Sequence, residues 1–218
     1  ANFSETFLAG QVGRPAAAAG SGITGIPSTR QEMEGDQPEG SRPAPAISLR
    51  GFDPSDADDL WDSMGDDMGS YNSWAESCPT RDAALDRLRA SIASYPWFRT
   101  VCLDDNGGGG GGPVGYVAAT PGSGVDRCRA EVSYGVARRH RGRGVATAAV
   151  RAGARQVFEE WPHLERLEGL VAVENVASLR VMEKAGFSRE GLLRSYRVTK
   201  GKVWDLVSYS LVRADWKG

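Results

Sequence analysis

The sequence is poor in cysteine and histidine, and each shortage excludes a class of site. Its three cysteines, Cys78, Cys102 and Cys128, are widely separated and form no C-x-x-C pair, so we expect neither a disulfide framework nor a cysteine-based zinc site. The chain has only two histidines, His140 and His163, which excludes a histidine-rich metal site. We therefore predict no bound metal, and reduced thiols in a cytosol-like compartment.

An excess of one charge and a long apolar run are also missing. The 26 Lys and Arg residues nearly balance 28 Asp and Glu residues, for a net charge of -2, which argues against a general nucleic-acid binder. No apolar run approaches the roughly 18 residues that span a bilayer, so we expect no membrane partner. The sequence predicts a cytoplasmic monomer or homodimer, and it leaves a nuclear or organellar location open.

Residues 1–45 differ in composition from the rest of the chain. They hold seven glycines and five prolines but only two aromatic residues, Phe3 and Phe7. Such a segment buries too little apolar surface to offset the entropy lost on ordering. It also lacks the basic start and apolar stretch of a secretory signal. We predict a flexible or disordered tail over residues 1–45 and one domain over residues 46–218.

The remainder alternates between strand and helix patterns and predicts a mixed α/β domain of about seven strands and four helices. Strands are expected over about 47–50, 97–103, 114–120, 130–136, 167–173, 188–198 and 203–212, and helices over about 55–64, 80–95, 145–160 and 175–186. Six consecutive glycines, Gly107 to Gly112, lie between two predicted strands and indicate a hairpin loop. A phosphate-binding loop would need a strand-to-helix junction, which is absent there.

The stretch Arg141-Gly142-Arg143-Gly144-Val145-Ala146 joins a predicted strand to a helix. Glycines at such a junction let a ligand approach the backbone, and the free N–H groups and dipole of the helix favour a pyrophosphate. Arg138 and Arg139 add further positive charge. The alternative is a Gly-x-Gly turn with solvated arginines. Thr147 breaks the Rossmann G-x-G-x-x-G pattern, no Gly-Lys-Ser/Thr follows as in a Walker A loop, and RNA-binding RGG segments are repeated and disordered.

A second motif runs from Glu174 to Phe187 and ends in Glu-Lys-Ala-Gly-Phe. Asn175 begins a predicted helix, and Ser178 lies one turn further along the same side. Alone, these two residues are equally well explained as a helix cap and a solvent-exposed serine. The two motifs together carry more information than either does alone.

Together the motifs resemble the GNAT superfamily of acetyl-CoA-dependent N-acetyltransferases over residues 47–212. Arg141, Gly144 and Ala146 fill the superfamily's acyl-CoA loop, Gln/Arg-x-x-Gly-x-Gly/Ala, in its strand–loop–helix setting. The second motif is similar to the branch of ribosomal-protein N-terminal acetyltransferases of the Rim type. Two further matches to that branch are Leu49-Arg50 with Ser55-Asp56-Ala57, and Gly201 with Asp205 and Tyr209-Ser210-Leu211.

The resemblance implies the GNAT acyl-CoA N-acyltransferase fold and acetyl-CoA as co-substrate. It implies direct transfer of the acetyl group to a primary amine of a protein N-terminus, a lysine or a small molecule. The fourth strand of this family bulges near Val136 and splays from the fifth strand, and a backbone N–H there would stabilise the oxyanion. Pantetheine would pair with residues 136–138. The residues implied to bind the co-substrate are Val136, Arg138, Arg141, Gly142, Arg143, Gly144, Val145, Ala146 and Asn175.

The amine arrives mostly protonated, so the reaction needs a base. Glu131 is the first candidate, with an ion pair to a nearby arginine as the alternative interpretation. Tyr134 is either a proton relay or a core aromatic residue. Many members donate a proton to the thiolate from a tyrosine seven residues after the asparagine, where this chain has Met182. The resemblance therefore assigns that role to Ser178, as proposed for the Rim-like branch.

Two other functions compete with the transferase. Because Met182 replaces the tyrosine donor, the protein could instead be a non-catalytic acyl-CoA-binding regulatory module. A third and weaker hypothesis is an RNA-binding module that uses the arginine loop. Asp205 is explained equally well as an acceptor-amine contact or as a turn ion pair.

Overall fold

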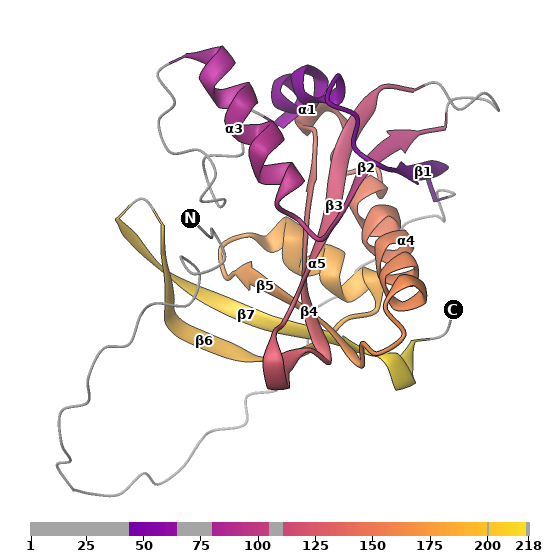
Figure 1. Ribbon diagram of the computed structural model, residues 1–218. Helices are drawn as coiled ribbons and strands as arrows, with labels where there is room; N and C mark the ends of the chain where they lie inside the picture. Colours follow the sequence, from indigo (N-terminus) through magenta and orange to yellow (C-terminus); the bar gives the residue numbers. More distant parts are fainter. Residues whose placement is uncertain (1–43, 65–79, 105–110, 200, 217–218) are drawn as a thin grey trace, which may run out of the picture. The chain divides into compact units, whose positions relative to one another are not determined.

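A seven-stranded mixed sheet with strand order β1-β2-β3-β4-β5-β7-β6 runs through the described part of the chain (Figure 1). The computed structural model describes residues 44–64, 80–104, 111–199 and 201–216, which lie within the unit Arg42–Gly218. The strands are β1 (Ile47–Arg50), β2 (Trp97–Leu103), β3 (Pro113–Pro121), β4 (Arg129–Val136), β5 (Arg166–Ala172), β6 (Ser188–Thr199) and β7 (Lys202–Val212). The helices are α1 (Asp56–Met64), α3 (Arg81–Ala93), α4 (Val145–Glu160) and α5 (Val176–Ala185).

The predicted fold class, about seven strands and four helices in a mixed sheet, is confirmed. Local signals account for this agreement: for example, Asn175 caps α5 by accepting the Ser178 N–H at 3.1 Å, and Gly186 ends the helix at φ 96°. The predicted tail lies outside the described residues except for residues 44 and 45. Of the six-glycine loop, only Gly111 and Gly112 are described.

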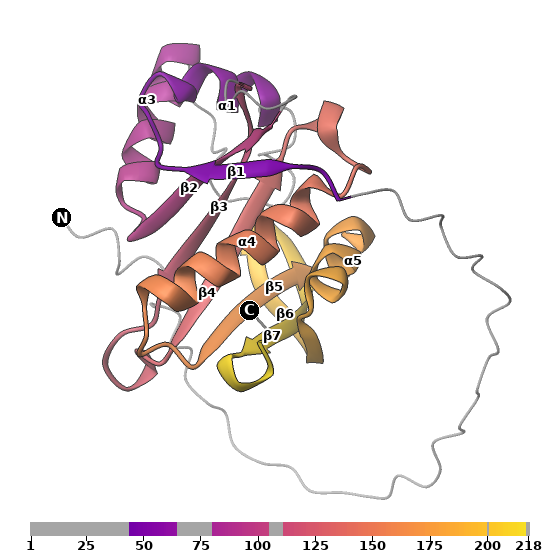
Figure 2. The same cartoon turned by 90° about the vertical axis from the view of Figure 1, so that its right-hand side faces the viewer.

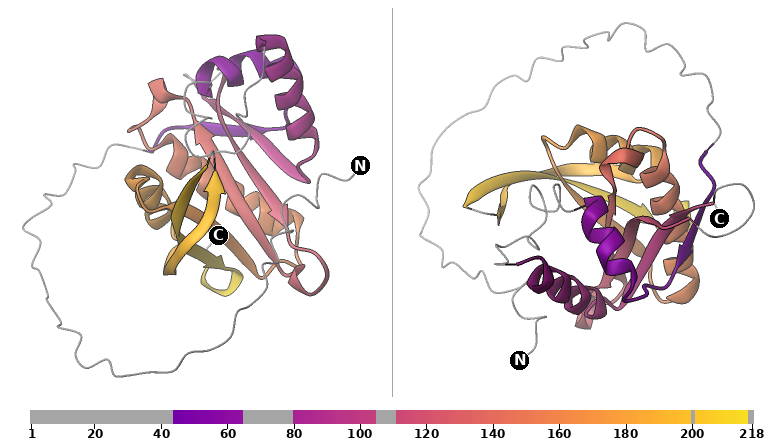
Figure 3. Two further views of the ribbon diagram at one scale, coloured as in Figure 1. Left: turned by 90° about the vertical axis from the view of Figure 1, so that its left-hand side faces the viewer. Right: turned by 90° about the horizontal axis from the view of Figure 1, so that it is seen from above.

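Helices cover both faces of the sheet, as Figures 2 and 3 show. α4 and α5 pack on one face over a core that includes Val117, Phe158 and Met182. α1 and α3 pack on the other face, over a smaller core that includes Phe98 and Tyr116, whose rings stack at 5.4 Å. Because side chains alternate along a strand, β2 and β3 contribute residues to both cores.

Small residues bring α4 close to the sheet. A Cβ built on Gly153 would lie 2.8 Å from a methyl carbon of Val117 on β3, so any larger residue would displace the helix. Ala149 and Ala154 on the same side of α4 are also buried. α4 therefore approaches the sheet closely, and Gly153 is a point of tight contact with β3.

The sheet splits between β4 and β5. These two parallel strands pair only from Arg129↔Arg166 to Glu131↔Glu168, whereas β4 continues to pair with β3 as far as Val136. β5 instead pairs along its whole length with β7. One edge of β4 is therefore without a neighbouring strand from residue 132 onward within the described residues.

The long β6–β7 hairpin contains an irregularity in its pairing. Leu193 pairs with Leu206 but Arg197 pairs with Trp204, so three residues of β6 lie opposite Asp205 alone. Ser195 in this bulge has φ 50°, and its N–H donates to Asp205 Oδ1 at 2.6 Å. Bulges of this kind bend a strand and redirect its side chains.

Candidate active site

The open edge of β4 presents backbone groups to the split in the sheet. The Ala137 N–H, just after β4, donates to the Val114 carbonyl of β3 at 2.8 Å. Because antiparallel pairing directs backbone groups alternately to either side, those of Tyr134 and Val136 point to the opposite edge, towards the split. The backbone N–H of Val136 therefore points towards the split, and Val136 is the position near which the resemblance implied an oxyanion donor.

The expected bulge near Val136 is wrong. The register of β3 with β4 is continuous from Gly115↔Val136 to Pro121↔Ala130. The edge is exposed because β5 turns away to pair with β7, so no bulge is needed to free it.

The loop that follows β4 ends directly at α4. Gly142 and Gly144 have φ of 69° and 81°, a backbone region that favours glycine. Gly144 is the N-cap of α4 and has no side chain to accept a bond from the first-turn N–H groups. Pro45 lies beside this loop, with its Cδ 3.4 Å from a Cβ built on Gly144. The start of α4 is therefore suited to an anion in the way that the sequence predicts.

The arginines of this loop do not all have the same role. The Nε of Arg141 donates to the Val136 carbonyl at 3.1 Å, which ties the loop back to the end of β4. Arg138 and Arg143 are exposed, and Arg139 Nε lies 2.9 Å from His140 Nε2. The sequence interpretation missed His140, which contacts its neighbouring arginine.

The first residues of α4 carry mainly backbone groups to this site. Val145 is buried and Ala146 is half-buried against the core, whereas Gly142 is exposed. Of the loop motif, the arginines and the backbone N–H groups are therefore the parts that face outward.

Asn175 and Ser178 are brought together at the start of α5. The Asn175 side-chain oxygen accepts the Ser178 N–H, so the capping interpretation of Asn175 is observed. Met182 is fully buried, and its Cε would meet a Cβ on Gly169 of β5 at 2.2 Å. Position 182 therefore faces the core, and this chain has no proton donor there.

Tyr134 bridges β4 and α5 across the split. Its side chain is half-buried against the core, and its hydroxyl donates to the Ser178 carbonyl at 3.2 Å. Burial raises the pKa of Tyr134 to about 12, so the phenol keeps its proton at neutral pH. Both interpretations of Tyr134, core aromatic and proton donor, agree with this position.

Glu131 lies at the last pairing position between β4 and β5, on the face covered by α1 and α3. Its side chain is 43% exposed, and its carboxylate lies 3.7 Å from the guanidinium of Arg197 on β6. Desolvation by the surrounding protein raises the pKa of Glu131, and Arg197 opposes that rise. The ion-pair interpretation is observed, and the position where the two strands begin to separate also suits a base.

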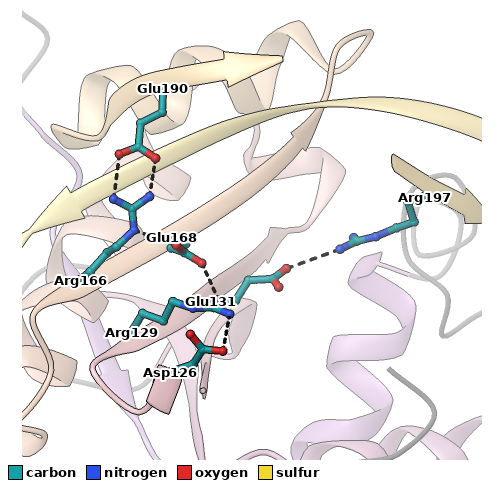
Figure 4. Close-up of polar contacts among 7 residues, drawn as sticks. All are labelled: Asp126, Arg129, Glu131, Arg166, Glu168, Glu190 and Arg197. Carbon is teal, nitrogen blue, oxygen red and sulfur yellow. Dashed lines mark hydrogen bonds and ion pairs between the residues drawn. The ribbon is translucent and has the colours of Figure 1, made fainter. Parts of the chain in front are cut away.

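Glu131 belongs to a larger group of charges, which we call the ion-pair cluster (Figure 4). Its members are Asp126, Arg129, Glu131, Arg166, Glu168, Glu190 and Arg197. They come from β4, β5, β6 and the turn before β4. Sequence reasoning missed this cluster, because charged residues that are far apart in sequence give no pattern until the strands are paired.

Among the described residues, no group of three or more His, Cys, Asp or Glu side chains is arranged to hold a metal ion. None of the helices in the same part of the chain is long and apolar enough to cross a membrane.

Comparison with known proteins agrees with this geometry. A family model described as "Acetyltransferase (GNAT) domain" matches residues 47–188. A Bacillus subtilis (strain 168) protein named as a ribosomal N-acetyltransferase, YdaF, is 31% identical over 177 residues, which cover 79% of this chain and 94% of that protein. A Bacillus licheniformis protein named "Uncharacterized N-acetyltransferase p20" is 36% identical over 90 residues, 41% of this chain, and this match spans only 50% of p20.

A solved structure shows the same fold. Mycobacterium smegmatis RimJ in complex with CoA-disulfide superimposes with a TM-score of 0.63 at 24% identity, over 78% of this chain and 83% of RimJ. The family model covers more than half of the chain, and YdaF matches along nearly its whole length. This chain therefore belongs to the GNAT acetyltransferase family.

Proposed function

We propose that the protein transfers an acetyl group from acetyl-CoA to a primary amine by direct attack of the amine on the thioester. The observation that carries this proposal is the unpaired edge of β4 at Val136, beside the start of α4, whose N-cap Gly144 has no side chain. An acyl-CoA needs both features, because its pyrophosphate requires N–H donors and its pantetheine amides require a strand edge.

The co-substrate would lie along this edge. The N–H groups of residues 144–146, with Arg138 and Arg143, would hold the pyrophosphate, and Arg141 would fix the loop through Val136. The backbone of residues 136–138 would pair with pantetheine. The side-chain oxygen of Asn175 caps α5, so its side-chain amide nitrogen would donate a hydrogen bond to the co-substrate.

In the proposed reaction the amine nitrogen forms a bond to the carbonyl carbon, and the carbon–sulfur bond then breaks. Glu131 accepts the proton that the amine loses, directly or through water. The Val136 N–H stabilises the oxyanion. The departing thiolate takes a proton from Ser178 or from Tyr134, whose hydroxyl lies next to the backbone of Ser178.

The acceptor is a primary amine of a protein N-terminus, a lysine or a small molecule. The name of YdaF, ribosomal N-acetyltransferase, makes ribosomal proteins the first acceptors to screen. We place this activity in the cytoplasm, on the domain of residues 46–218, in a monomer or homodimer.

Calorimetric titration with acetyl-CoA, followed by a thiol-release assay with a panel of amines, tests the proposal. We expect binding in the micromolar range and acceptor-dependent release of CoA. Glu131→Gln should lower kcat about 100-fold or more with the Kd for acetyl-CoA unchanged. Glu159→Gln, which removes an exposed carboxylate on α4 paired with Arg155, is the matched control and should leave both values unchanged.

The same experiment separates the competing functions. Binding of acetyl-CoA without CoA release for any amine would favour the non-catalytic acyl-CoA-binding module. That alternative rests on the buried Met182, which supplies no proton donor. Absence of binding by a folded protein would contradict both functions.

A further inference from the structure

The arginines around Glu131 differ in which carboxylates they form ion pairs with. Arg129 lies beside it on β4 but is paired with Glu168 at 2.8 Å and with Asp126 at 3.4 Å. Arg166 on β5 is paired with Glu168 and Glu190. Among the described residues, Arg197 is the cation within ion-pair distance of Glu131.

The position of Arg197 is unexpected from the order of the strands. β6 lies three strands from β4 in the sheet, separated from it by β5 and β7. Figure 4 nevertheless shows the Arg197 side chain extending from the hairpin towards Glu131. The hairpin therefore brings a charge from the outer edge of the sheet to the point where β4 and β5 begin to separate.

The bulge in β6 determines where Arg197 stands along β7. Before the bulge Leu193 pairs with Leu206, and a regular ladder from there would place Arg197 opposite Lys202. The two extra residues of β6 instead place it opposite Trp204, about 7 Å further from the hairpin turn. Asp205 holds the bulge by accepting the Ser195 N–H.

We propose that Arg197 is a positioning residue for Glu131, presented by the Ser195–Asp205 bulge so that the carboxylate stays ionised and fixed at the point where β4 and β5 begin to separate. This role rests on the proposed function, in which Glu131 accepts the proton of the amine. The charged groups that face Glu131 are Arg129 on its own strand, Glu168 on β5 and Arg197 on β6. Arg129 is paired with two other carboxylates, so Arg197 is the cation whose ion pair is with Glu131 itself.

The test is a titration of the Glu131 carboxyl carbon by NMR in full-length protein labelled with ¹³C-glutamate, assigned with Glu131→Gln. Arg197→Met should raise the pKa of Glu131 by about one unit, because a positive charge close to a carboxylate favours its ionised form. Arg197→Lys should restore most of the shift. Arg194→Met, an exposed arginine in the same bulge, is the matched control and should leave the pKa unchanged.

Two outcomes would overturn the proposal: an unchanged pKa in Arg197→Met, or an equal rise in Arg194→Met, which would indicate a nonspecific charge effect. Asp205→Ala tests the bulge and should raise the pKa as Arg197→Met does. No rise in Asp205→Ala would overturn the role of the bulge.

Kinetics give an independent measurement. With an accepted amine, Arg197→Met should lower kcat about 10-fold while the KM for acetyl-CoA stays unchanged, and Arg197→Lys should recover activity. If Glu131 is not the base, Glu131→Gln keeps full activity whatever the titration gives. Failure of the proposed function and failure of the role of Arg197 are therefore distinguishable.

Discussion

The loop that begins α4 and the ion-pair cluster are built in opposite ways. Residues 141–147 are contiguous, and their character depends on local conformation: two left-handed glycines and an N-cap without a side chain. The seven members of the ion-pair cluster come from three strands and the turn before β4, and they are spread along the sequence from Asp126 to Arg197. One region is a local motif, and the other is a product of strand pairing.

The difference explains why the loop was visible in the sequence and the cluster was not. A helix N-terminus binds anions through backbone groups, so glycine and arginine spacing suffices to predict it. An ion pair depends on which strands are neighbours, and a bulge of two extra residues changes the pairs along a whole hairpin. Perturbing each region should therefore give different signatures.

The largest effect is expected from Thr147→Glu, at the third position of α4. A glutamate there is favourable for the helix, since it reaches back to the N-cap N–H, but it occupies that donor and repels a pyrophosphate. We expect the affinity for acetyl-CoA, measured by calorimetry, to fall about 100-fold while the melting temperature is kept.

Thr147→Gln is the control for shape, because it reaches the same N–H without a charge, and it should lose much less affinity. Wild-type affinity in Thr147→Glu would contradict the assignment of the loop. Gly144 is a poorer position for this test, because at φ 81° any side chain strains the backbone.

A smaller effect is expected from Tyr134→Phe, which joins the two regions across the split. The change removes the hydroxyl that donates to the Ser178 carbonyl but keeps the ring in the core. If this hydroxyl protonates the thiolate, kcat should fall by up to about 10-fold with the Kd for acetyl-CoA unchanged. Unchanged kcat, measured by thiol release, would leave Tyr134 as a core residue and Ser178 as the donor.

The smallest effect is expected from Glu190→Gln in the ion-pair cluster. Hydrogen bonds from Arg166, and next from the Ser210 hydroxyl at 2.8 Å, lower the pKa of Glu190 from 4.5 to about 2. Because the folded-state pKa lies below the ordinary value, this carboxylate stabilises the fold above pH 4.5, and the contribution is lost as the pH falls towards 2.

Glu190→Gln should therefore lower the melting temperature by about 2 °C at pH 7, since an exposed pair contributes little, and the difference should close near pH 2. Thermal melts across this pH range check it, with Glu159→Gln as an exposed control. A difference that does not change with pH would show that the loss comes from packing.

Much of the fold follows from local patterns in the sequence. The apolar alternation in β4, the N-cap Asn175 and the closing Gly186 each specify an element through neighbouring residues alone. The loop before α4 belongs to the same class, as do Asn175 and Ser178, which lie within one turn. These features depend on residues a few positions apart, so the chain's order is enough to predict them.

The tertiary structure decided the rest, because it depends on which strands are neighbours. β5 leaves β4 after Glu131 to pair with β7, which is the splay that the resemblance implied, and this departure frees the edge at Val136 without the bulge that was also implied. The same pairing buries Met182 against Gly169 and brings Arg197 to Glu131. Local composition determined the elements and the anion-binding loop, whereas the surroundings of the candidate base were set by long-range strand pairing, which leaves no periodic signal in the sequence.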